Sequence, residues 1–153
     1  MKTIESEIVI AKANPEDIPD VSELFDQYRV FYGQSSNIQA AANFISDRMT
    51  KNESVIFWAR KANKPVGFVQ LYPSFSSVSM KKVWVLNDLY VEEIARRHGI
   101  AELLMNTAKE FANKTEAKGI TLCTAVINTP AQKLYEKLGY IKNETYYYYY
   151  LYF

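Results

Sequence analysis

The stretch Leu86-Asn87-Asp88-Leu89-Tyr90-Val91 is followed, after Glu92-Glu93-Ile94-Ala95, by Arg96-Arg97-His98-Gly99-Ile100-Ala101, and these residues are the most informative part of the sequence. The first part suits a strand, and the second opens a segment, 99–118, whose apolar side chains recur with helical spacing. The first turn of a helix has main-chain N–H groups without helical partners, which concentrate about half a positive charge. A strand, a tight turn and a helix start therefore predict a phosphate or diphosphate site, which Gly99 allows a ligand to approach closely. One glycine is too few for a Rossmann fingerprint, and the Gly-Lys-Ser/Thr end of a P-loop is missing.

Strands and helices are predicted on both sides of this stretch. Asn14 and Asn37 are expected to cap two helices upstream of it, and Gly33 to end the first of these. The other predicted segments are a strand over 8–11, a hairpin over 55–61 and 66–72, a Ser-rich loop over 73–79, strands over 83–91 and 121–127, a helix over 130–138 and a terminal strand over 146–153. This order predicts an α/β layered fold with a mixed sheet, in which residues 1–153 form a single domain.

The composition excludes several classes of function. Eighteen basic and seventeen acidic side chains leave a net charge of +1, which disfavours nucleic acid and membrane surfaces as partners. The single cysteine, Cys123, and the single histidine, His98, give no disulfide and no Cys/His metal cluster, so no metal is expected and Cys123 is predicted to be buried. Residues 1–7 lack the apolar core of a signal peptide, and no run reaches the roughly 18 apolar residues of a membrane span. A cytoplasmic location is therefore predicted.

Further motifs lie at informative distances from the first. Arg96, Gly99 and Ala101 match the pattern Arg/Gln-x-x-Gly-x-Gly/Ala, and Asn128-x-x-Ala131 leads downstream into Tyr135 and Gly139-Tyr140. Together with the strand end at 89–91, these motifs resemble the acetyl-CoA loop and the second signature of GNAT N-acetyltransferases. Segments 28–34 and 67–72 resemble the bacterial and fungal branch that acetylates polyamines or amino acids.

The resemblance implies a GNAT-type acyl-CoA N-acyltransferase fold, with a mixed, mostly antiparallel sheet of six to seven strands, a splayed parallel strand pair and four helices. It also implies an enzyme that moves acetyl from acetyl-CoA to a primary amine of a small molecule by direct attack in a ternary complex. The diphosphate is expected on the main-chain N–H groups of residues 97–101 and the pantetheine arm along the strand end. The cofactor-binding residues that the resemblance implies are Leu89, Tyr90, Val91, Arg96, Arg97, His98, Gly99, Ile100, Ala101, Asn128, Ala131 and Tyr135.

Three residues are candidates for the chemistry. Tyr135 occupies the family's position for the partner of the departing thiolate, or else packs on the core face of its helix. Asn87 stands where diamine-type relatives often have a glutamate, and an amide cannot take up the proton of the amine. In a strand without a bulge, the side chain of Asp88 points to the opposite side from that of Asn87. Asp88 either holds a substrate ammonium or forms a hydrogen-bonded pair with Asn87 at a strand irregularity.

The missing glutamate bears on the acceptor. Neutralising a lysine-like amine at pH 7 costs about 4.6 kcal/mol, against about 1 kcal/mol for an α-amine, so an α-amino acceptor such as an amino acid is predicted. Acceptor contacts are expected from Tyr28, Tyr32, Gln34 and Tyr72, with core packing as the alternative for Tyr28.

Two other functions stay open, a protein N-terminal or lysine acetyltransferase and a non-catalytic acetyl-CoA-binding regulatory module. The aromatic C-terminal strand predicts a homodimer.

Overall fold

The computed structural model describes residues 7–153, so most of the segment used to exclude a signal peptide, residues 1–6, lies outside the described part. Contacts group the chain into two compact units, residues 1–122 and 123–153. Whether they form one functional domain stays a prediction. No helix within residues 7–153 is long and apolar enough to cross a bilayer.

The first unit is built on one five-stranded sheet with the order β1-β2-β3-β4-β5. Its strands are β1 (Ile8–Lys12), β2 (Val55–Lys61), β3 (Lys64–Ser76), β4 (Lys81–Val91) and β5 (Ile120–Thr121). The first four pair antiparallel, and only β4 and β5 pair parallel. The mixed, mostly antiparallel sheet with a parallel pair is confirmed, but the sheet has five strands rather than six or seven.

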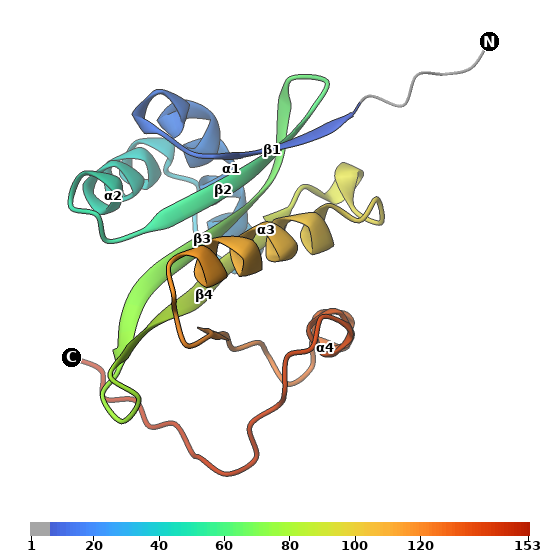
Figure 1. The fold of residues 1–153 in the computed structure, drawn as a ribbon. Helices are drawn as coiled ribbons and strands as arrows, with labels where there is room; N and C mark the ends of the chain where they lie inside the picture. The colour runs from blue at the N-terminus through green and yellow to red at the C-terminus, as the bar shows by residue number, and fades with distance from the viewer. Residues whose placement is uncertain (1–6) are drawn as a thin grey trace. The chain divides into compact units, whose positions relative to one another are not determined.

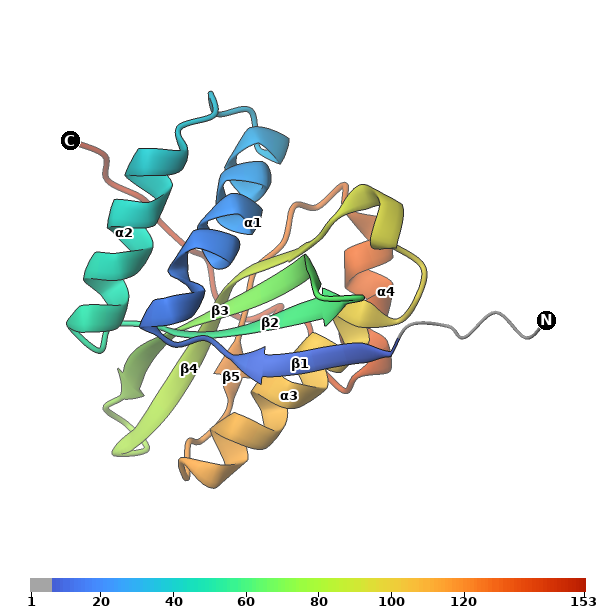
Figure 2. The same cartoon turned by 90° about the horizontal axis from the view of Figure 1, so that it is seen from above.

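Helices cover both faces of this sheet. Helices α1 (Ile18–Phe31) and α2 (Ile38–Thr50) pack together on one face, and α3 (Ile100–Lys114) lies on the other (Figures 1 and 2). Asn14 forms a capping box with Asp17 just before α1, and the Asn37 side chain accepts a hydrogen bond from Ala40 N at 3.0 Å, so both predicted caps are confirmed. The core between α1, α2 and the sheet consists of apolar side chains that include Val21, Leu24, Phe25, Ala41, Ile45, Ile56, Trp58 and Phe68.

The long hairpin of β3 and β4 changes two predicted boundaries. The predicted Ser-rich loop, 73–79, is mostly strand, because β3 continues to pair with β4 as far as Ser76 opposite Lys81. Helix α3 is shorter than predicted and ends at Lys114, since Glu116 adopts a positive φ of 56° that a helix cannot continue through.

The fifth strand is shorter than the sequence predicts. Only Ile120–Thr121 is strand, and residues 122–127 are not. Local bonds take the place of a ladder there, because Asn128 N donates to Ala125 O at 2.9 Å and Gln132 Nε2 donates to Val126 O at 2.9 Å. Cys123, in the same segment, is exposed rather than buried.

The second unit contains helix α4 (Thr129–Lys137), which confirms the predicted fourth helix. The predicted terminal strand is wrong, because residues 146–153 have no strand conformation and their side chains are exposed. Five consecutive tyrosines offer no alternation of apolar and polar faces, so nothing in the sequence sets a register for pairing.

Candidate active site

A β-bulge in β4 places the polar pair Asn87 and Asp88. The register with β3 pairs Gln70 with Asp88 and Leu71 with Leu86, so Asn87 is the extra residue of the ladder. The strand is therefore not regular here, and the alternative of a hydrogen-bonded pair at a strand irregularity is confirmed. The bulge lets neighbouring side chains meet, and Asn87 Nδ2 donates to Asp88 Oδ1 at 3.0 Å.

Asp88 is a buried carboxyl, only 3% exposed, held by polar side chains from three elements. Gln70 Nε2 on β3 donates to Asp88 Oδ2 at 2.6 Å, and the hydroxyl of Tyr28 on α1 also hydrogen-bonds to Asp88. Burial raises the pKa of the Asp88 carboxyl above its usual value, and the hydrogen bonds from Gln70, Tyr28 and Asn87 oppose that rise. Within residues 7–153, no Lys, Arg or His forms an ion pair with Asp88.

Two tyrosines flank this carboxyl. Burial, and then the neighbouring Asp88, raise the pKa of Tyr72 to about 12 and raise the pKa of Tyr28 further. Both tyrosines are half-buried and remain neutral donors at any physiological pH. Tyr28 also packs at its ring face or edge against Phe25, Phe68 and Tyr90, so it has both the core role and the polar role that its sequence position allows.

The end of β4 has a free edge. Its parallel pairing with β5 stops at Val85 and Thr121, and residues 86–91 have no strand partner on that side within the described part of the first unit. Glu92 N donates to Val66 O at 2.8 Å, so strand alternation directs the main-chain groups of Tyr90 toward β3 and those of Leu89 and Val91 toward the free edge. Of the three residues predicted to line the pantetheine arm, Leu89 and Val91 therefore present main-chain groups outward.

The segment between β4 and α3 exposes a row of main-chain donors. After the short turn Glu93–Ala95, Arg97 and Gly99 both adopt positive φ values, 67° and 73°. The N–H groups of residues 97–101 have no acceptor within residues 7–153. The first helical bond of α3 is from Leu103 N to Gly99 O. A Cβ added to Gly99 would meet nothing within 4 Å. This arrangement suits an anionic group held by N–H donors.

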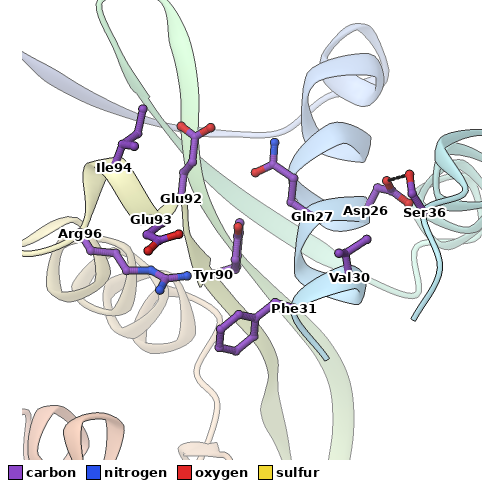
Figure 3. A pocket seen from close by; sticks show the side chains of 10 residues that line it. All are labelled: Asp26, Gln27, Val30, Phe31, Ser36, Tyr90, Glu92, Glu93, Ile94 and Arg96. Atoms are coloured by element: carbon purple, nitrogen blue, oxygen red, sulfur yellow. Dashed lines mark hydrogen bonds between the residues drawn. The ribbon is translucent and has the colours of Figure 1, made fainter. Parts of the chain in front are cut away.

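The side chain of Arg96 extends away from this row of N–H groups. Its Nε donates to Val91 O at 2.9 Å, and its guanidinium lies 5.4 Å from the ring centre of Phe31 and 5.8 Å from that of Tyr90. Figure 3 shows the side chain extending from the turn toward these two rings. Arg96 thus joins the end of β4 to the end of α1 in the first unit.

A concavity of about 680 Å³ opens between α1 and the end of β4. It is lined by Asp26, Gln27, Val30, Phe31, Ser36, Tyr90, Glu92, Glu93, Ile94 and Arg96 (Figure 3). Asp26 fixes one wall, because its carboxylate accepts hydrogen bonds from Ser36 Oγ at 2.6 Å and from Asn37 N at 2.7 Å. These bonds hold the loop between α1 and α2 against α1, and the bond from Ser36 is the main cause that lowers the pKa of Asp26.

The predicted acceptor residues fall into two groups. Tyr28 and Tyr72 flank Asp88, whereas Tyr32 and Gln34 are exposed at the end of α1. Tyr32 joins the first group only through its ring, 4.9 Å from that of Tyr28. The sequence did not single out Gln70 or Phe31. Only the alternation of Gln70 with apolar neighbours in a buried strand could have marked it.

Three predicted residues belong to the second unit. Asn128 caps α4, because its Oδ1 accepts from Ala131 N at 3.3 Å. Tyr135 lies on α4 with its ring 6.0 Å from that of Tyr140. Burial raises the pKa of Tyr140 to about 12. Among residues 7–153, no group of three His, Cys, Asp or Glu side chains is placed to hold a metal ion.

Comparisons with known proteins agree with this geometry. The model of the acetyltransferase (GNAT) family matches residues 19–140. The chain is 44% identical to the uncharacterized N-acetyltransferase YhfO of Bacillus subtilis, over 86% of this chain and 88% of that protein. It is 26% identical to the D-amino-acid N-acetyltransferase HPA3 of Saccharomyces cerevisiae, over 91% and 88%.

Solved structures give the same result. The crystal structure of a probable acetyltransferase has a TM-score of 0.90 and 40% identity, covering 95% of this chain and 97% of that one. A predicted acetyltransferase of Clostridium acetobutylicum, solved with acetyl-CoA, has a TM-score of 0.74 at 15% identity, covering 93% and 95%, and shows the shared fold. The chain therefore belongs to the acetyltransferase (GNAT) family and is an N-acetyltransferase.

Proposed function

We propose that this enzyme transfers the acetyl group of acetyl-CoA to the primary amine of a small molecule, and that the acceptor is an α-amine of the amino-acid type rather than a polyamine. The observation that carries the proposal is the buried Asp88 at the β4 bulge, which has three hydrogen bonds and no cation beside it within residues 7–153. A substrate ammonium would supply the missing positive charge.

The residues of the first unit fit acetyl-CoA as the acetyl donor. The five free N–H groups of residues 97–101 suit its diphosphate, and the open space beside Gly99 leaves room for it. The free edge of β4 offers the main-chain groups of Leu89 and the N–H of Val91 to an extended amide-containing arm, as an added strand would use them, while the Val91 carbonyl accepts from Arg96. Acetyl-CoA bound in one GNAT neighbour supports this assignment.

The residues around the proposed amine site favour an acceptor that loses its proton readily. Asn87 is exposed at the bulge, but its amide cannot accept a proton. Asp88 is buried, so a proton leaving the amine reaches it only through water or through the Tyr28 hydroxyl. An α-amine needs about 1 kcal/mol to be neutral at pH 7, compared with about 4.6 kcal/mol for a polyamine nitrogen. The name of the yeast relative, a D-amino-acid N-acetyltransferase, points the same way.

Tyr135 is proposed as the group that gives a proton to the departing thiolate. The proposal rests on the motif from Asn128 to Tyr140, because a phenol with a pKa near 10 can protonate a thiolate of pKa near 8.5 only when the two are held together. Phenylalanine at this position keeps the ring and removes the proton.

The homodimer and the cellular location are also proposals. Homodimerisation now rests on the exposed aromatic side chains of residues 146–153 rather than on an edge strand. Light scattering coupled to size-exclusion chromatography tests it, with a chain that stops before residue 146 as the control. A cytoplasmic location is proposed from the composition.

An amine screen tests the function. Release of free thiol from acetyl-CoA is measured with a panel of L- and D-amino acids, short peptides, and putrescine, spermidine and spermine. We expect amino acids to give the highest kcat/KM at pH 7.5. Spermidine outrunning every amino acid would overturn the acceptor assignment, and thiol release that no amine accelerates would overturn acetyl transfer to amines.

A further inference from the structure

We infer that Gln70 is a positioning residue for the acceptor amine. Gln70 holds the carboxyl of Asp88, and Asp88 orients the amide of Asn87 so that the Asn87 carbonyl oxygen faces the acceptor. The inference rests on the proposed function, because it assumes that the amine binds at the β4 bulge. It concerns a residue on β3 that lies outside both GNAT signature motifs.

The burial of Gln70 shows that its side chain serves the interior of the site. Gln70 is fully buried, with 0% exposure, and glutamine is a residue usually found at the surface. Its Nε2 is only 2.6 Å from Asp88 Oδ2, while its Oε1 is buried without a hydrogen-bond partner in the described chain. An apolar residue would fill this place at lower cost, unless the amide is needed to hold Asp88.

The orientation of both amides follows from the chemistry of a carboxylate. An ionised carboxylate only accepts hydrogen bonds, so each amide that contacts it must present its NH₂ group. Gln70 presents its NH₂ to Oδ2 and Asn87 presents its NH₂ to Oδ1. The carbonyl oxygen at the other side of the Asn87 amide then points away from Asp88, and Asn87 is exposed. That oxygen can accept a hydrogen bond from an ammonium or an amine.

The charge on Asp88 therefore controls the site. Its surroundings are Tyr28 from α1, Gln70 and Tyr72 from β3, and Asn87 from β4, all neutral. Arg48 of α2 acts on Tyr72, whose pKa it lowers, and it forms an ion pair with Glu53 at 2.6 Å. With no cation on Asp88 itself, the hydrogen-bond donors are the groups that favour the ionised carboxylate against the burial that raises its pKa. If Asp88 takes up a proton, it becomes a donor and Asn87 no longer has a fixed orientation.

Two substitutions at Gln70 have opposite expected effects on pH dependence. Gln70→Leu removes the donor, so Asp88 stays protonated to a higher pH, and the acceptor KM rises most strongly on the acid side. Gln70→Glu keeps the shape. Its added carboxyl donates to Asp88 when protonated and repels Asp88 when ionised, so the acceptor KM rises most strongly on the alkaline side. A purely structural role for Gln70 would give both variants the same direction.

The experiment measures acceptor KM and kcat from pH 5.5 to 9 with the best amine of the screen, for wild type, Gln70→Leu, Gln70→Glu and Val69→Ala. Val69 is the matched control, because it is fully buried in the same strand and its side chain lies on the opposite face from Gln70. At pH 7 we expect Gln70→Leu to raise the acceptor KM by about 10- to 100-fold, the loss of one hydrogen bond to a charged group, with the affinity for acetyl-CoA unchanged by calorimetry.

The outcomes separate the inference from the function on which it rests. Opposite displacements of the two KM profiles, with Val69→Ala like wild type in shape, support the inference. Profiles of both Gln70 variants that keep the wild-type shape overturn it, even when the enzyme acetylates amines. A wild-type protein that binds acetyl-CoA but acetylates no amine contradicts the proposed function instead. Circular dichroism at each pH shows whether the variants are folded.

Discussion

Gly99 allows the proposed diphosphate site to be tested by a pair of equivalent substitutions. Both Gly99 and Gly33 have positive φ values, 73° and 86°, and an added Cβ would meet nothing within 4 Å at either position. Alanine in this conformation costs about 1–2 kcal/mol, so Gly99→Ala and Gly33→Ala should lower the free energy of unfolding by similar amounts. For a chain of this length each kcal/mol lowers Tm by about 2–4 °C.

The two variants should differ in how they bind acetyl-CoA. The Gly99 N–H lies within the row of free donors at residues 97–101, and a Cβ added there enters open space. Alanine keeps the N–H group, but its methyl group would keep a bound phosphate from approaching the donor closely. Loss of one hydrogen bond to a charged phosphate oxygen costs about 1.5–3 kcal/mol, which corresponds to a Kd about 10- to 150-fold weaker. Gly33 lies in the loop after α1, and its substitution should leave this Kd unchanged.

Isothermal titration calorimetry with acetyl-CoA, without an acceptor, gives the Kd of each variant, and urea unfolding gives its stability. Gly99→Asn adds a third point, because asparagine tolerates a positive φ better than alanine and so separates obstruction from backbone strain. Equal acetyl-CoA affinities for wild type, Gly33→Ala and Gly99→Ala, with the expected losses of stability, would refute the placement of the diphosphate.

Four further results are expected. Gly67→Ala should cost about 1–3 kcal/mol of stability by urea unfolding, because its Cβ would lie 2.9 Å from the main-chain oxygen of Tyr90; an unchanged midpoint would contradict the close approach of β3 and β4. Asp26→Ala should cost about 1–3 kcal/mol at pH 7 by leaving the donors of Ser36 and Asn37 unpaired. Since folding lowers the pKa of Asp26, its ionised form stabilises the fold above the unfolded pKa near 3.9, and this stabilisation is lost as the pH falls below that value. The difference in unfolding free energy between wild type and Asp26→Asn should therefore shrink between pH 5 and pH 3. A constant difference would contradict this. Tyr135→Phe should lower kcat by about 100-fold or more with little change in the KM for acetyl-CoA, and a kcat within twofold of wild type would remove Tyr135 from the chemistry.

The parts of the fold that local sequence specifies could be predicted. Asn14 and Asn37 cap helices because their side chains reach the first free N–H groups, and this depends only on residues three or fewer positions away. The row of donors before α3 was also predictable, because a helix start is a local event. Arg96, Gly99 and Ala101 indicated the family together with the strand end at 89–91 and the motif from Asn128 to Tyr140.

The parts that depend on pairing between distant segments could not be predicted. The bulge at Asn87 exists only in relation to Gln70 and Leu71 on β3, so the strand pattern alone could not decide between a regular strand and an irregular one at Asp88. The aromatic residues 146–153 were mistaken for a strand, because β propensity describes how a side chain packs on a sheet rather than whether a partner strand is present. Gln70 was missed for a related reason, since its partner Asp88 is eighteen residues away in sequence.

The extra residue in β4 also bears on how acceptor preference can be re-engineered. Asn87 has no partner of its own in the ladder with β3, so its side chain contributes no cross-strand packing. A laboratory library confined to this codon can therefore vary the size and charge offered to incoming amines while the sheet keeps its hydrogen bonds. New specificities in this scaffold are most accessible at that one position.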